Sequence, residues 1–113
     1  MCRLWHNRMK KTVVVDPRSA REINKFPREV QLKFKQDFEI LEKDGRLVEP
    51  EAKKLISTKG LFEIRVKYKG QWRAIYAYAT SDTIVILSAF AKKTQKTPIE
   101  ELNKAKKRLL EYT

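Results

Sequence analysis

The chain has 113 residues, enough for one domain with its own hydrophobic core and no disulfide cross-links. Its 26 Lys and Arg against 14 Asp and Glu leave a net charge of +12, which favours a polyanionic partner such as nucleic acid, an acidic membrane or an acidic protein. A single Cys and a single His exclude an internal disulfide and a histidine metal cluster.

The beginning of the chain is basic and polar. Residues 1–11 lack the apolar stretch of a signal peptide, and no apolar run approaches the ~20 residues of a membrane helix. We therefore expect a cytoplasmic protein, with a basic extension at 1–11 followed by one domain at 12–113. Met9, before two lysines and a valine run, is a second possible translation start.

The first predicted elements are a short strand and a helix. Residues 12–15 form a β-branched run, typical of a strand. Asp16 and Pro17 then match a helix start, with Asp as the N-cap and Pro at the first helical position. Pro27 disfavours helical geometry in the residue before it, so this helix should end near Phe26.

A longer helix is predicted over residues 28–44. Its apolar residues recur at helical spacing and form one stripe, and Gly45 follows where a C-terminal cap belongs. The stripe consists of Val30, Phe34, Phe38 and Leu41. The two helices should form a hairpin, and residues 46–60, which show no clear period, should cross the molecule as a loop.

Three strands are predicted next, at about 61–68, 72–79 and 83–91. A three-residue turn at 69–71 would place Tyr68 opposite Trp72 and sort the side chains of the first two strands into two faces. One face is apolar and aromatic, with Phe62, Ile64, Val66, Tyr68, Trp72, Ala74, Tyr76 and Tyr78. The other carries Glu63, Arg65, Lys67, Arg73, Ile75 and Ala77. The aromatic residues are expected to pack in the core.

Thr97 to Glu100 match a capping box with proline at the first helical position, which predicts a last helix to about Tyr112. The predicted fold is therefore α+β: an N-terminal strand, a helical hairpin, a three-stranded antiparallel sheet and a C-terminal helix. We expect the helices to pack on one face of the sheet and the other, basic face to stay partly open.

The positive charge is concentrated on the sheet. Residues 61–96 hold seven cations and two anions, whereas residues 17–44 hold seven cations and six anions. The seven sheet-region cations are Arg65, Lys67, Lys69, Arg73, Lys92, Lys93 and Lys96. This asymmetry favours a phosphate-binding face, although solvated cations that guard a strand against aggregation give the same pattern. Glu63 is either a general base or, as we prefer, an ion-pair partner.

Metal and cofactor sites are not expected, because the chain lacks an acidic ligand cluster and a Gly-rich phosphate loop.

Three stretches of the sequence resemble a known family: "GLFEIRVKYKGQWRAIYAY", "IVILSAFAKKTQKTP" and the basic final helix. Together they are similar to the phage-derived toxins of the RelE/ParE superfamily, close to the HigB type. The resemblance covers about residues 12–112.

This resemblance implies the toxin of a type II toxin–antitoxin pair, an endoribonuclease that cleaves mRNA in the ribosomal A site without metal. Its antitoxin would be a helix-turn-helix protein. By family analogy, Arg65 and Lys67 contact the scissile backbone, Arg73 holds the phosphate and Lys93 follows the last strand, with Glu63 or a lysine as the base. Lys69, Lys92 and Lys96 would bind RNA. Two alternatives stay open: a non-catalytic toxin that inhibits DNA gyrase, and an inactive RNA-binding remnant.

Overall fold

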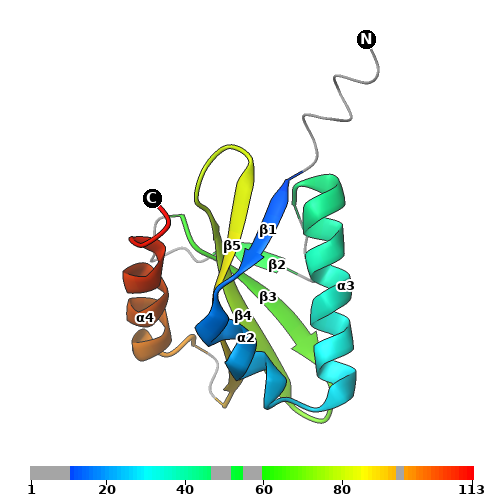
Figure 1. Cartoon of the computed structure of the whole chain (residues 1–113). Coiled ribbons are helices and arrows are strands. Elements are labelled where there is room, and N and C mark those ends of the chain that lie inside the picture. The colour runs from blue at the N-terminus through cyan, green and yellow to red at the C-terminus, as the bar shows by residue number, and fades with distance from the viewer. Residues whose placement is uncertain (1–10, 47–51, 55–59, 94–95) are drawn as a thin grey trace.

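The computed structural model describes residues 11–46, 52–54, 60–93 and 96–113 as a sheet with helices on both faces (Figure 1). In chain order the elements are β1 (Thr12–Val15), α2 (Pro17–Asn24), α3 (Arg28–Asp44), β2 (Ala52–Lys54), β3 (Phe62–Lys67), β4 (Gln71–Tyr78), β5 (Thr83–Lys92) and α4 (Ile99–Leu109). The α+β class is confirmed. The second possible start, Met9, lies outside the described residues.

The sheet has five strands in the order β1-β5-β4-β3-β2, so the prediction of a three-stranded antiparallel sheet was incomplete. β1 pairs parallel with β5, and the other pairs are antiparallel. β2 falls in the predicted loop, because the short run Ala-Lys-Lys has no apolar alternation to mark it as a strand.

The β3–β4 hairpin turns one step earlier than predicted. Lys67 pairs with Gln71, so the loop residues are 68–70, and Trp72 lies opposite Val66 instead of Tyr68. Lys69 and Gly70 both have positive φ, 48° and 136°, which closes this tight loop. The register differs from the prediction by two residues. Because side chains alternate with a period of two, every residue keeps its predicted face.

The face covered by α2 and α3 holds the larger core. Both predicted helix starts are confirmed, and α3 ends at Gly45, whose left-handed backbone (φ 79°) caps the helix. Phe34 and Leu41 are fully buried against Ile64, Tyr76 and other residues of the sheet. The aromatic side chains of β3 and β4 lie on this face, as expected, with Phe62 and Trp72 partly buried at its rim.

The opposite face is covered in part by α4, which corrects the prediction that all helices lie on one face (Figure 1). Ala105 is fully buried, and Leu102 and Leu109 pack with it on Ile75 and Leu87. The predicted capping box was wrong. Pro98 occupies the N-cap position without a side-chain hydrogen bond, the helix begins at the following residue, and it ends at Leu109 instead of Tyr112.

Polar contacts tie α4 to α2 around the free part of β5. β1 pairs only with residues 83–86 of β5, so the edge of the strand beyond them needs other partners. Glu22 Oε1 accepts from the backbone N–H of Ala89 at 3.0 Å, and Arg108 Nη1 donates to the carbonyl of Leu87 at 2.8 Å. Arg108 Nη2 also pairs with Glu22 Oε2 at 3.2 Å. Glu22 and Arg108 therefore provide hydrogen-bond partners for backbone groups at the edge of β5, and their ion pair joins α2 to α4.

A second polar link joins the chain end to the start of α2. Asp16, fully buried, caps the helix by accepting from the N–H of Arg18 at 2.8 Å. Its Oδ2 also accepts from Arg18 Nη2 at 2.7 Å and from the Tyr112 hydroxyl at 2.8 Å. The Arg18 hydrogen bonds, with a smaller contribution from Tyr112, hold the pKa of Asp16 well below its usual range despite the opposing effect of burial.

This depressed pKa predicts a pH-dependent stability. Asp16 stabilises the fold fully above its unfolded pKa of about 4, and that contribution is lost as the pH falls below this value. Asp16→Asn should therefore lower the free energy of unfolding at pH 7 and lose less of it than the wild type between pH 7 and pH 3. Urea unfolding at both pH values measures this. Asp44→Asn, at an exposed position, is the control. An equal drop in the free energy of unfolding between pH 7 and pH 3 in all three proteins would contradict the prediction.

Candidate nucleic-acid interface

The predicted cations of β3, β4 and β5 meet at the β3–β4 turn, on the face that carries α4. Two rows of directly opposite residues cross the strands there. One row is Lys67, Gln71 and Lys92, and the other is Arg65, Arg73 and Phe90. Side chains opposite each other in an antiparallel pair have Cβ atoms only about 5 Å apart. The two rows therefore bring four of the predicted site cations together.

Glu63 is the centre of this group. It is 1% exposed, and its Oε1 lies 3.4 Å from Arg73 Nε and 3.7 Å from Lys92 Nζ. Its Oε2 accepts a hydrogen bond from the Thr97 hydroxyl at 2.6 Å. The carboxylate thus contacts groups from β4, from β5 and from the segment before α4. This geometry fits the preferred prediction that Glu63 is an ion-pair partner.

Arg73 is buried, with an exposed fraction of only 5%, and each part of its guanidinium contacts a protein group. Besides the contact of Nε with Glu63, Nη1 donates to the carbonyl of Trp72 at 3.0 Å, and Nη2 donates to Gln71 Oε1. Burial lowers the pKa of Arg73, Glu63 opposes this, and the nearby Arg65 lowers it further. An arginine stays protonated even so. Arg73 is therefore a fixed positive charge behind the surface.

The other predicted cations are more accessible. Arg65 is partly exposed beside Arg73, and Lys67 and Lys69 are exposed at the turn, where the Lys69 ammonium lies 5.6 Å from the centre of the Tyr68 ring. Two arginines directly opposite on neighbouring strands repel each other, so the Arg65–Arg73 pair needs the nearby Glu63 carboxylate. The structure thus separates the cations into a buried set, Arg73 with Lys92, and a more exposed set on β3.

The segment after β5 continues the exposed set. Lys92 ends the strand with only 10% of its side chain exposed, whereas the next residue, Lys93, is exposed. Lys96 is exposed as well, and residues 94 and 95 lie outside the described ones. Thr97 anchors this segment to Glu63. The sequence pattern assigned Thr97 to a helix cap and so missed its bond to Glu63. It also missed Gln71, whose position in the alternating pattern of β4 places it on the same face as Arg73.

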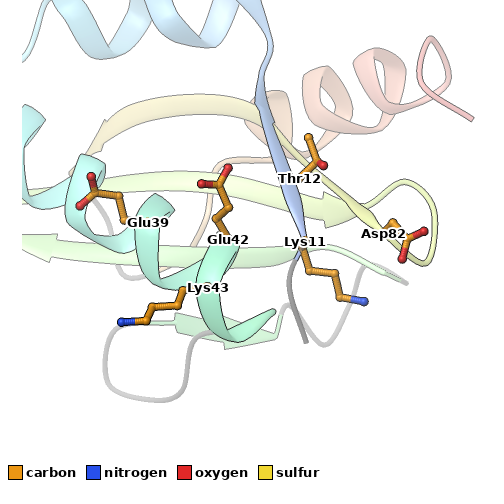
Figure 2. A pocket seen from close by; sticks show the side chains of 6 residues that line it. All are labelled: Lys11, Thr12, Glu39, Glu42, Lys43 and Asp82. Atoms are coloured by element: carbon orange, nitrogen blue, oxygen red, sulfur yellow. The ribbon is translucent and has the colours of Figure 1, made fainter. Parts of the chain in front are cut away.

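A cavity lies at the other end of the strands and contains none of the predicted site residues. About 690 Å³ in volume, it is lined by the end of α3, the start of β1 and the turn before β5 (Figure 2). Its charged side chains are of both signs: Lys11, Glu39, Glu42, Lys43 and Asp82. This mixture does not match the polyanionic partner that the net charge of the chain favours.

Within the described ranges, no group of three or more His, Cys, Asp or Glu side chains is arranged to hold a metal ion. In the same part of the chain, no helix combines the length and apolar character needed to span a bilayer. The candidate site is the group of cations at the β3–β4 turn, because the strand register and the contacts of Glu63 bring them together.

Comparison with known proteins identifies the family. Residues 21–110, most of the chain, match the family described as phage derived protein Gp49-like. The chain belongs to this family. No match is found among curated protein sequences.

Solved structures show that this Gp49-like chain has the fold of RelE. A mutant of the E. coli toxin RelE in the free state matches with a TM-score of 0.67 and 19% identity, over 88% of this chain and 98% of that one. The intact E. coli RelBE toxin–antitoxin complex gives 0.60 and 18%, over 74% and 99%. The isolated E. coli RelE toxin gives 0.59 and 19%, over 82% and 96%. The expected resemblance is thus confirmed in two parts: a phage-derived family by the family match, and the RelE fold by the solved structures.

The buried contact between Glu63 and Arg73 predicts strong coupling between them. Glu63→Gln and Arg73→Met should each destabilise the protein by about 3 kcal/mol, because each removes an opposite charge that a buried charge contacts. The double variant should be more stable than the sum of the two losses by about 1–3 kcal/mol. Urea unfolding of the four proteins measures the coupling. Glu42 is exposed on α3, so the effects of Glu42→Gln and Arg73→Met on the free energy of unfolding should add to within about 0.5 kcal/mol. Equal coupling in the two mutant cycles would contradict a specific interaction between Glu63 and Arg73.

Proposed function

We propose that this protein is the toxin of a type II toxin–antitoxin pair and acts in the cytoplasm as a ribosome-dependent mRNA endonuclease. The observation that carries the proposal is the pair of cationic rows at the β3–β4 turn, anchored by a buried carboxylate. Membership of a phage-derived family and the RelE fold support it. The closer relation to HigB-type toxins is part of the same proposal.

The proposed chemistry needs positive charge more than it needs a metal. The 2′-oxygen of a ribose attacks the adjacent phosphorus, the bond to the 5′-oxygen breaks, and negative charge builds up on the phosphate oxygens. Preorganised cations stabilise that charge. Arg65, Lys67 and Lys93 are accessible for direct contact, and Lys69 and Lys96 extend the same basic surface. Arg73 and Lys92, held by Glu63, supply fixed positive charge behind them.

Glu63 is better suited to holding cations than to accepting a proton. It is almost completely buried and contacts Arg73, Lys92 and Thr97, so a ribose hydroxyl reaches it only if these contacts break. Of the two candidates for the general base, the geometry thus favours a lysine. Lys67 and Lys93 are the exposed ones next to the rows. The one that accepts the proton reacts as a neutral amine, and the other keeps its positive charge. The remaining proton transfer, to the departing 5′-oxygen, falls to a neighbouring ammonium group or to water.

The catalytic proposal predicts a selective loss of activity in Arg65→Ala. Primer extension on an mRNA incubated with translating ribosomes should show cuts with the wild type, and Arg65→Ala should slow them by roughly 10²- to 10³-fold, as expected when one group that stabilises the developing charge is removed. Because Arg65 is partly exposed, its loss should change stability by less than about 1 kcal/mol. Lys33→Ala, an exposed cation on α3, is the matched control.

Two results would contradict this reading. Cuts that persist at the wild-type rate in Arg65→Ala would remove Arg65 from the site. Growth arrest without any cuts would favour the gyrase alternative, which a DNA supercoiling assay tests directly. Binding of RNA without cleavage or growth arrest would favour the inactive remnant.

The partner in this proposal is an antitoxin, a helix-turn-helix protein encoded next to the toxin. The matched RelBE structure is a toxin–antitoxin complex, which supports such a partner without identifying it. Expression of the neighbouring gene should restore growth in cells that produce this protein, and the two proteins should co-purify. Growth arrest that every adjacent gene leaves unchanged would contradict the pairing.

A further inference from the structure

Gln71 is part of the same surface, although neither the sequence pattern nor the proposed mechanism assigned it a role. It is the first residue of β4, it is exposed, and it lies between Lys67 of β3 and Lys92 of β5. Its side chain is on the face of Arg73, since the two residues are two positions apart on one strand. Gln71 is thus a neutral, polar residue in the middle of a cationic row.

The orientation of the Gln71 carboxamide is determined by its neighbour. Arg73 Nη2 donates to Oε1 of Gln71, and a guanidinium has donors only, so the oxygen must face the arginine. Arg73 is itself held by Glu63 and by the carbonyl of Trp72. The amide nitrogen of Gln71 is left on the other side, and it has no hydrogen-bond partner among the described residues.

From this arrangement we infer that Gln71 contacts the RNA backbone and donates its amide N–H groups to a phosphate oxygen. The inference rests on the proposed function. Neutral side-chain amides commonly donate to phosphate oxygens in nucleic-acid complexes. Here the donor is preorganised by a buried arginine and flanked by two lysines, both of which favour an anionic acceptor. Because Arg73 holds the Gln71 carboxamide in place, the amide N–H groups of Gln71 would position the phosphate of the bound RNA strand.

The test compares Gln71→Glu with Gln36→Glu. Both changes replace an exposed glutamine by a carboxylate, but Gln36 lies on α3, which packs on the other face of the sheet. A glutamate at position 71 still accepts from Arg73, so the urea midpoint of Gln71→Glu should be no lower than that of the wild type. Its affinity for a labelled short single-stranded RNA, measured by fluorescence anisotropy, should fall roughly 10- to 100-fold, the equivalent of one hydrogen bond to a charged group. Gln36→Glu should change it less than about threefold.

A salt titration separates contact from a purely structural role. Gln71→Ala should weaken RNA binding without changing the slope of log affinity against log salt, because a neutral side chain releases no counterion. Lys67→Ala should lower that slope by about 0.7. Equal affinities of Gln71→Glu and Gln36→Glu, with wild-type RNA binding intact, would overturn the role of Gln71 alone. A wild-type protein that neither binds this RNA nor cuts mRNA on ribosomes would overturn the proposed function as well.

Discussion

The candidate site depends on one buried carboxylate. Arg65 and Arg73 lie directly opposite each other on β3 and β4. Without the Glu63 carboxylate, which contacts Arg73, their positive charges would repel each other with no nearby anion to offset the repulsion. With it, Arg73 and Lys92 are held at 3.4 Å and 3.7 Å, and Thr97 at 2.6 Å. A single charge therefore orders groups from three parts of the chain. A buried ion pair contributes little net stability, so its value here is the defined position of the cations.

The second constraint is the partial cover that α4 provides. Its apolar residues pack over Ile75 and Leu87, in the middle of β4 and β5, and its polar residues reach around the strand edge to α2. The ends of β3 and β4 near the turn carry Arg65, which is partly exposed, and Lys67 and Gln71, which are exposed. Among the described residues, α4 thus covers the middle of this face and leaves the exposed cations near the turn accessible.

Burial gives these cations different roles. Buried positive charges cannot reorient toward a ligand, but they act through a medium of low dielectric constant and raise the potential of the surface in front of them. Exposed lysines move freely and contact the ligand directly, with weaker orientation. The combination of a fixed inner set and a mobile outer set suits a flexible, polyanionic ligand such as single-stranded RNA. Gln71 lies where the two sets meet.

Local features of the sequence determined much of this fold. Asp16 and Pro17 begin α2, Pro27 separates the helices, and Gly45 ends α3, because caps and proline act on neighbouring residues. The period of two on β3 and β4 likewise placed Glu63 and the cations on one face, even with the turn predicted one residue late. Contacts between distant segments decided the rest: the parallel pairing of β1 with β5, the strand β2, the face that α4 covers and the bond of Thr97 to Glu63. None of these leaves a periodic or local signal, because each depends on which remote surface satisfies a strand edge, an apolar stripe or a buried charge.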